Sequence, residues 1–378
     1  MRIESAPPAQ LLTAVRTDRL RKEKCVRAYL ERCMAETFRE PRAAIDLCLE
    51  APEYVRRCKQ KLGSRYPDSL VLAYGIVGTA LGLCGSYSMS REAFRAGSQI
   101  TGASDLELAG LKIRCARIEL RRERYHYALK LVNETVQTLE SQEPQTVRDD
   151  LNPAIPFIYR AVINGNIMNF TDDPGRVTPD SVFRDFELGL QLAPVGCART
   201  RASAIHGICY TAATLWLGGY MTKDVTPVMV METALRFRER LRKEGTPYSS
   251  PIDAKVRWTL GLSMFQLFGG LGRGAEKHFR EARKVLSFGA TEKDIAAITL
   301  DLQWCLLADG RWTAALDECK VLEETLGQEG TILMWANALR NRIIPSEVIG
   351  NVYSKWRGLR RVAMPVADEE SDSDPIGF

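Results

Sequence analysis

The sequence predicts an all-α protein built from repeated pairs of helices. The chain has 378 residues, of which 45% are hydrophobic and 26% charged, an ordinary globular composition that can bury a core. Leu, Ala, Arg and Glu, which favour helices, are abundant, and no stretch shows the sustained Val, Ile and Thr alternation of strands. Small and aromatic residues also recur at helical spacing, which is typical of a repeat architecture.

The first repeat is expected at residues 74–97. Gly78 lies on a helix that ends before Gly85, and Ser90, Phe94 and Gly97 lie on one face of the next helix. Small residues such as Gly78 let the two helices of a hairpin approach closely, and the ring of Phe94 fills the hole beside them. The spacing therefore predicts an antiparallel helix pair.

Further helix pairs follow at intervals close to one repeat length. We expect them at residues 106–139, 157–194, 199–244, 258–282 and 294–322. The third pair contains an insertion at residues 171–180, which is expected on a loop. Residues 328–341 and 346–361 predict two closing helices.

These positions resemble the tetratricopeptide repeat (TPR) over residues 67–327, with Tyr74, Val77, Gly78 and Leu81 on the first helix and Ser90, Phe94 and Gly97 on the second. Residues 256–326 are similar to a group of mostly uncharacterised bacterial TPR proteins. The matching features are Trp258, Gly270-Leu271-Gly272-Arg273, Ala275-Glu276-Lys277-His278-Phe279-Arg280-Glu281-Ala282-Arg283 and the helix from Ile295 to Leu307. The resemblance implies a right-handed antiparallel helix-hairpin (TPR-like) solenoid with a concave peptide-binding groove, and it implies no reaction.

Four segments are therefore expected. They are a basic N-terminal helical region (1–66), TPR-like repeats (67–327), closing helices (328–363) and an acidic tail expected to be disordered (364–378). Residues 1–65 hold 15 Lys and Arg against 9 Asp and Glu, whereas residues 368–374 are acidic without a basic residue. A basic head attracts acidic partners, and an acidic tail can compete for them.

The cysteines and the N-terminus predict a cytoplasmic protein. Ten cysteines are scattered without a CxxC pair, so we expect them to fill the core as free thiols in a reducing compartment. The N-terminus has no apolar signal region, and no run of about 18 apolar residues predicts a membrane span.

No motif of a catalytic, cofactor or metal site is recognisable, so we expect neither an enzyme nor a cofactor. The three histidines, His126, His206 and His278, fall in different repeats, and His206 with Cys209 lacks the further ligands of a zinc site. The segment from Gly269 to Gly274 is glycine-rich, but no strand precedes it, and an inter-helix turn explains it. A helical enzyme would require a buried acid or nucleophile with a perturbed pKa.

The leading hypothesis is a non-catalytic module that binds another protein or peptide in a TPR groove, inside a bacterial regulatory or defence complex. The candidate partner-binding residues are polar or basic side chains on first helices, namely Lys112, Arg114, Arg117, Arg201, His206, Lys255 and Arg257. An acidic polypeptide is favoured over nucleic acid, because the basic runs at residues 236–243 and 355–361 accompany no helix-turn-helix signature. No membrane and no small-molecule substrate are expected as partners.

The alternative hypothesis is a ligand- or peptide-gated regulator. In that case residues 1–66 form an effector module that contacts DNA or a response protein, and the basic charge of this segment motivates it.

The repeat register makes one packing prediction. Small residues at repeat spacing should lie at helix–helix contacts, namely Gly78, Ala116, Ala275, Ala282 and Ala315.

Overall fold

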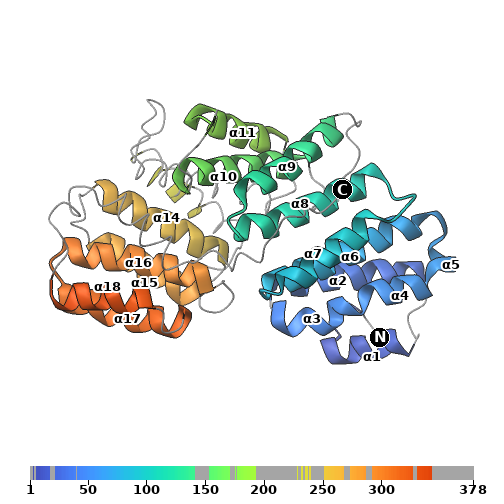
Figure 1. The fold of residues 1–378 in the computed structure, drawn as a ribbon, viewed down its shortest axis with the longest axis horizontal. Coiled ribbons are helices and arrows are strands. Elements are labelled where there is room, and N and C mark those ends of the chain that lie inside the picture. The colour runs from blue at the N-terminus through green and yellow to red at the C-terminus, as the bar shows by residue number, and fades with distance from the viewer. Residues whose placement is uncertain are drawn as a thin grey trace. The chain divides into compact units, whose positions relative to one another are not determined.

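A computed structural model describes much of the chain (Figure 1). The described residues are 3, 6–17, 22–39, 41–140, 153–170, 175, 177–192, 228, 231–232, 235–236, 238–239, 251–267, 273–286, 292–326 and 330–342. They form two compact units that divide at residue 160, within one helix. Every regular element among these residues is a helix, so the predicted all-α hairpin class is confirmed.

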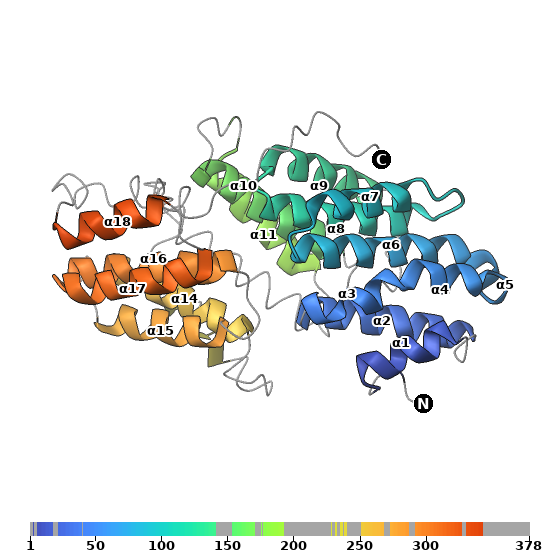
Figure 2. The ribbon, with the colours of Figure 1, turned by 60° about the horizontal axis from the view of Figure 1, so that its bottom comes forward.

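The first unit holds the N-terminal helices and two hairpins. Its elements are α1 (Pro8–Arg16), α2 (Glu23–Arg39), α3 (Pro41–Leu49), α4 (Ala51–Arg57), α5 (Lys59–Leu62), the 3-10 turn η1 (Gly63–Arg65), α6 (Tyr66–Leu83), α7 (Tyr87–Ser98), α8 (Asp105–Arg121) and α9 (Tyr125–Glu140). Helix α6 packs against α2, α3 and α4 on one side and against α7 and α8 on the other, as Figure 2 shows. It is therefore the central helix of this unit.

The second unit holds two further hairpins and a last helix. Its elements are α14 (Pro251–Leu267), α15 (Arg273–Leu286), α16 (Glu292–Ala308), α17 (Trp312–Leu326) and α18 (Gly330–Arg340). Each of these helices packs against the next one along the chain. Between the hairpins of the two units the chain forms α10 (Ala154–Phe170), which contains the division, and α11 (Pro179–Leu192). Of the insertion predicted on a loop at residues 171–180, positions 171–178 come between these two helices in the sequence, whereas Pro179 and Asp180 form the beginning of α11.

First and second helices of a hairpin are buried to different extents. From Leu70 to Gly82 every residue of α6 except Tyr74 is buried, because neighbouring helices cover it on several sides. The second helix α7 instead buries a single stripe, consisting of Ser90, Ala93, Phe94 and Gly97. This i, i+3, i+4, i+7 spacing marks a helix with one covered face and one face in solvent.

One turn geometry ends the first helix of three hairpins. At the end of α6 the Ser86 N–H donates to the Leu81 carbonyl at 2.9 Å, and Gly85 has a φ of 86°. The same bond pattern closes α8 around Glu123 and α16 around Gly310, whose φ values are 62° and 70°. This is the Schellman arrangement, which satisfies the last helix carbonyls and reverses the chain.

The shared turn aligns the three hairpins residue by residue. Counting from the left-handed residue, the seventh residue before it and the ninth after it form the pairs Gly78 and Phe94, Ala116 and Val132, and Gln303 and Cys319. A Cβ added at Gly78 would lie 2.9 Å from the Phe94 ring, and the Gln303 Nε2 lies 3.3 Å from the Cys319 Sγ. In the α6 and α7 hairpin the large side chain at the crossing, Phe94, lies on the second helix. In the α16 and α17 hairpin the large side chain, Gln303, lies on the first helix. The space between the two helices is filled in both hairpins.

The predicted packing positions are confirmed. Gly78 is buried against Phe94, and Ala116, Ala275, Ala282 and Ala315 are all 0% exposed. In the α14 and α15 hairpin, a Cβ at Gly261 would lie 2.7 Å from the ring of Phe279. The hole and the aromatic ring predicted for the first repeat thus recur in the second unit.

The N-terminal helices share one core with the first hairpin. Tyr29 on α2 and Tyr54 on α4 meet edge to face with ring centroids 5.0 Å apart, and both are fully buried. Leu72 and Ile76 of α6 belong to the same cluster. Helices α2 and α4 are therefore packed against the hairpin that follows them.

Two buried thiols join α2 to α3. The Cys48 Sγ lies 3.2 Å from the Thr37 hydroxyl and 3.8 Å from the Cys33 carbonyl oxygen. Burial raises the pKa of the Cys33 thiol, whereas the hydrogen bond from Cys33 lowers the pKa of Cys48 against the effect of burial. The expectation that cysteines fill the core is confirmed for the buried free thiols Cys33, Cys48, Cys58, Cys115, Cys305 and Cys319.

Several predicted segments lie outside the described residues. They are most of the repeat at residues 199–244, the closing helix at 346–361, the tail at 364–378, Cys197 and Cys209. The first closing helix, expected at residues 328–341, is α18. Among the described residues, no helix combines the length and the apolar character needed to cross a membrane.

Candidate interaction surface

Helix α8 carries three of the predicted partner-binding residues, and the structure places them differently. Ser104 caps the beginning of the helix, because its hydroxyl accepts a hydrogen bond from the Glu107 N–H at 3.3 Å. Lys112 and Arg117 stay partly exposed on a helix that is otherwise largely buried. The two side chains point in directions about 140° apart, since each residue of an α-helix turns the chain by about 100°.

Lys112 is held in place by the second helix of its own hairpin. Its Nζ lies 2.8 Å from the Glu134 Oε2 on α9, and the side chains are 20% and 32% exposed. The ion pair fixes the direction of a side chain that would otherwise sample many rotamers.

Arg114 lies deeper, at 8% exposure. Its Cδ would be only 3.2 Å from a Cβ at Gly75, so the absent side chain of Gly75 makes room for the arginine stem on α6. Arg114 thus packs between first helices, and its contribution to a partner-binding surface stays a prediction.

In the second unit, Arg257 on α14 is fixed by two carboxylates. Its Nε donates to the Asp253 Oδ2 at 2.7 Å, and its Nη1 forms an ion pair with Glu281 on α15. The other Asp253 oxygen accepts from the Arg238 Nε at 2.7 Å, although Asp253 is only 2% exposed. A buried carboxylate between two guanidinium groups is compensated on both oxygens.

His278 lies beside this arginine pair. Burial, together with the positive charges of Arg238, Arg257 and Lys277, lowers the pKa of His278 to about 4, although Asp253 acts in the opposite direction. The imidazole is therefore neutral at physiological pH.

The remaining predicted residues are not tested by the structure. Arg201 and His206 lie outside the described residues, and nothing is described of the Lys255 side chain. The structure therefore brings together no complete set of the predicted residues.

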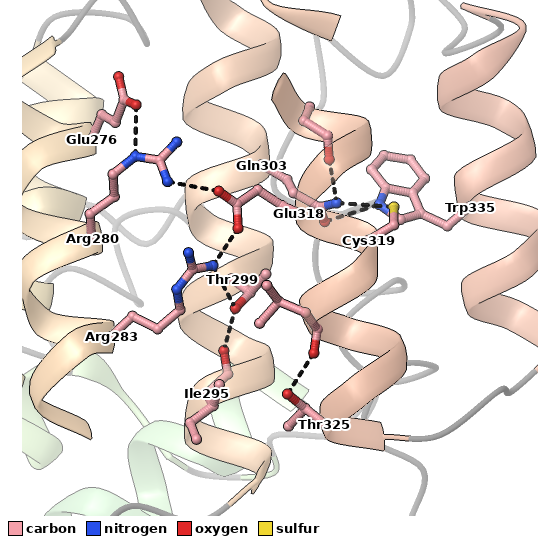
Figure 3. A network of polar contacts seen from close by, with 12 residues as sticks. Glu276, Arg280, Arg283, Ile295, Thr299, Gln303, Glu318, Cys319, Thr325 and Trp335 are labelled. Carbon is pink, nitrogen blue, oxygen red and sulfur yellow. Dashed lines mark hydrogen bonds and ion pairs between the residues drawn. The ribbon is translucent and has the colours of Figure 1, made fainter. Parts of the chain in front are cut away.

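A chain of ion pairs across α15 and α17 was not predicted. The Glu318 carboxylate accepts from the Arg280 Nη1 at 2.8 Å and also binds Arg283, as Figure 3 shows. Glu276 accepts from the Arg280 Nε at 2.8 Å and from the Arg311 Nη1 at 2.5 Å. The spacing of Glu276 and Arg280 was a local signal, but the bonds to Glu318 join residues 35 and 38 positions apart.

These ion pairs lower the pKa of Glu276. Burial acts to raise its pKa, but the hydrogen bonds from Arg280 and Arg311 outweigh burial and lower the pKa. The network therefore holds the carboxylates of Glu276 and Glu318 between arginines and ties α15 to α17.

Helix α16 carries buried polar groups that bind its neighbours. The Gln303 Nε2 donates to the Ala315 carbonyl at 2.9 Å, and its Oε1 accepts from the Trp335 Nε1 at 3.1 Å (Figure 3). A single amide thus joins α16 to α17 and α18.

Within the described residues, no group of three or more His, Cys, Asp or Glu is arranged to hold a metal ion.

The fold is similar to that of a solved structure, whereas the sequence matches no known family. No protein-family model matches the sequence, and a comparison with curated proteins finds no match. The chain is similar to a crystal structure of the apo form of RapI, with 10% sequence identity and a TM-score of 0.49. The alignment covers 88% of this chain and 87% of that chain.

Proposed function

We propose that the protein is a non-catalytic interaction module that holds another polypeptide against the first helices of its hairpins. One observation carries the proposal. In each unit a first helix carries a partly exposed cation that a glutamate of the following helix fixes, as in Lys112 with Glu134 and Arg257 with Glu281.

Fixed cations are suited to binding a polypeptide. Side chains already held in one geometry lose less conformational entropy when a partner binds. Their N–H groups can donate to backbone carbonyls or to carboxylates of an extended peptide, which are strong charge-assisted hydrogen bonds. An acidic polypeptide in a bacterial regulatory or defence complex is the partner that we propose.

The test starts from the full-length protein. Partners are captured from the host and identified by mass spectrometry, and the purified partner is titrated against Lys112→Glu. Lys130→Glu is the matched control, since Lys130 is exposed on α9 of the same hairpin. We expect Lys112→Glu to weaken binding by about tenfold or more, or roughly 1.5–3 kcal/mol for a lost charged contact. Equal binding by the two variants, at unchanged melting temperatures, would refute the proposal.

The second candidate function is a regulator whose N-terminal region contacts DNA or a response protein. The exposed lysines Lys59 and Lys61 on α5 favour it. Deleting residues 1–66 cannot test this function, because the deletion would remove Tyr29 and Tyr54 and so expose Leu72 and Ile76, which belong to the same core. Lys59→Glu with Lys61→Glu leaves that core intact. If this double variant loses binding while Lys112→Glu binds fully, the binding site is the N-terminal region and not the first-helix surface.

A further inference from the structure

The first unit has a corner with a strong excess of positive charge. We call it the basic corner and define it by Lys22, Lys24, Lys59, Lys61 and Arg65, all of which are exposed. The ion pair between Arg65 and Glu23 joins the end of η1 to the beginning of α2, and it brings the two groups of lysines together. Residues 22–24 and 59–65 carry five cations and one carboxylate, a net charge of +4.

Next to the basic corner, two arginines of α4 are each paired with an acidic side chain. On α4, Arg56 lies 3.3 Å from the Glu53 carboxylate, and Arg57 lies 3.0 Å from that of Glu50. These arginines are matched by acids of the same surface. At the basic corner Glu23 faces Arg65, and the charge of four lysines exceeds what that carboxylate offsets.

We propose that the basic corner binds the acidic segment of the same chain, Asp368-Glu369-Glu370-Ser371-Asp372-Ser373-Asp374, so that another acidic polypeptide can occupy the corner only when this segment leaves it. The segment carries five carboxylates, and no Lys or Arg follows Arg361. Its charge of −5 complements the +4 of the corner.

The chemistry of the corner favours an acidic polypeptide over nucleic acid. Lysine ammonium groups on flexible stems act as point charges and suit a run of carboxylates without a fixed geometry. The Arg65 guanidinium, which could bind a phosphate in a bidentate way, is engaged by Glu23. The Tyr66 ring, a potential platform for a base, already has the Lys59 Nζ 5.2 Å from its centroid.

Because the acidic segment and the basic corner belong to the same chain, weak ion pairs are sufficient to hold them together. Exposed ion pairs are each worth little and are screened over about 10 Å at 0.1 M salt. A ligand on the same chain, however, reaches an effective concentration on the order of 1 mM when its linker spans the two sites. The segment can therefore occupy the corner within one molecule and still leave when an acidic partner binds more tightly.

The test measures competition in the full-length chain. The probe is a fluorescent peptide of residues 364–378, followed by anisotropy. It is titrated with the unaltered chain and with a chain whose five acids at residues 368–374 are changed to Asn or Gln. We expect the neutralised chain to bind the probe several-fold more tightly, because its own segment no longer competes, and we expect salt to weaken this binding.

Matched charge reversals locate the site. In the neutralised chain, Lys59→Glu with Lys61→Glu should weaken probe binding by about tenfold. Lys130→Glu with Lys320→Glu changes the net charge equally at exposed positions on α9 and α17 and should leave binding unchanged. Melting curves confirm that each variant is folded.

Four outcomes would overturn the proposal. Equal affinity of the neutralised and unaltered chains would show that the segment does not compete. Equal loss in both reversal pairs would show unspecific attraction. Concentration-dependent dimers that neutralisation dissolves would make a second copy the occupant. Binding of duplex DNA that depends on Lys59 and Lys61, without peptide binding, would make nucleic acid the ligand. None of these outcomes involves Lys112, so the proposed function is tested separately.

Discussion

The indole N–H of Trp258 donates to a carboxylate oxygen of Asp301 at 2.6 Å, and both residues are nearly inaccessible to solvent. Trp258 lies on α14 and Asp301 on α16, so the bond joins the first helices of consecutive hairpins. Contacts between first helices are what allow one hairpin to stabilise the next in a repeat protein.

Replacing Trp258 with Phe should therefore destabilise the second unit. The variant removes the donor and leaves a buried carboxylate with one hydrogen bond fewer, at a cost of roughly 1–3 kcal/mol. Urea denaturation measures this loss. Trp312→Phe, at a partly exposed position at the beginning of α17, is the control. An equally large loss in the control would show that the hydrogen bond to Asp301 does not account for the loss of stability.

Adding a methyl group at Gly78 should also destabilise the protein. The new Cβ would lie 2.9 Å from the Phe94 ring, and overpacking of this kind typically costs about 1–3 kcal/mol. The double variant Gly78→Ala with Phe94→Leu should recover part of the loss, because the ring that clashes is gone. A double-mutant cycle measures this coupling, and purely additive losses would contradict the proposed contact.

The turn at Gly310 should not tolerate a side chain. Its φ of 70° is left-handed, and an L-residue there costs roughly 1–2 kcal/mol. Gly310→Ala should therefore lower the midpoint of denaturation. Gly274→Ala, at the beginning of α15 with a right-handed backbone, should leave the midpoint unchanged or raise it slightly. The opposite order of the two variants would refute the role of the turn.

Protonation of His278 should weaken the fold as the pH falls. Its pKa is about 4 in the folded chain and 6.5 as an ordinary histidine, so the unfolded chain binds more protons between these values. The free energy of unfolding should therefore decrease from pH 7 to pH 4, and the decrease should be smaller in His278→Gln. The groups facing His278 are Arg238, Arg257, Lys277 and Asp253. Urea titrations of both proteins at several pH values give the comparison, and parallel curves would rule out this contribution.

Local spacing predicted the parts of the fold that depend on one hairpin alone. Gly78, Phe94 and Ala275 follow from the periodicity of small and aromatic residues, and the structure confirms their burial. The bond between Trp258 and Asp301, and the arginines on Glu318, join residues that only folding brings together. No spacing rule identifies such partners in a single sequence.

The candidate site shows the same limit. The sequence placed Lys112 and Arg114 on a first helix, yet it did not show that Glu134 holds one and that Gly75 makes room for the other. Side chains two positions apart on a helix face different neighbours. Which one reaches solvent depends on how the adjacent helix packs.

The large side chain at the helix crossing lies on the second helix in one hairpin and on the first helix in another, and this limits which helices can be paired with each other. Helix α7 carries the large Phe94, whereas α16 carries the large Gln303 at the position where α6 has Gly78. Transplanting α7 onto α16 would bring both large side chains to one crossing, and pairing α6 with α17 would leave a void beside Cys319. For these two hairpins, the unit that can be exchanged without a clash or a void is therefore the matched pair of helices.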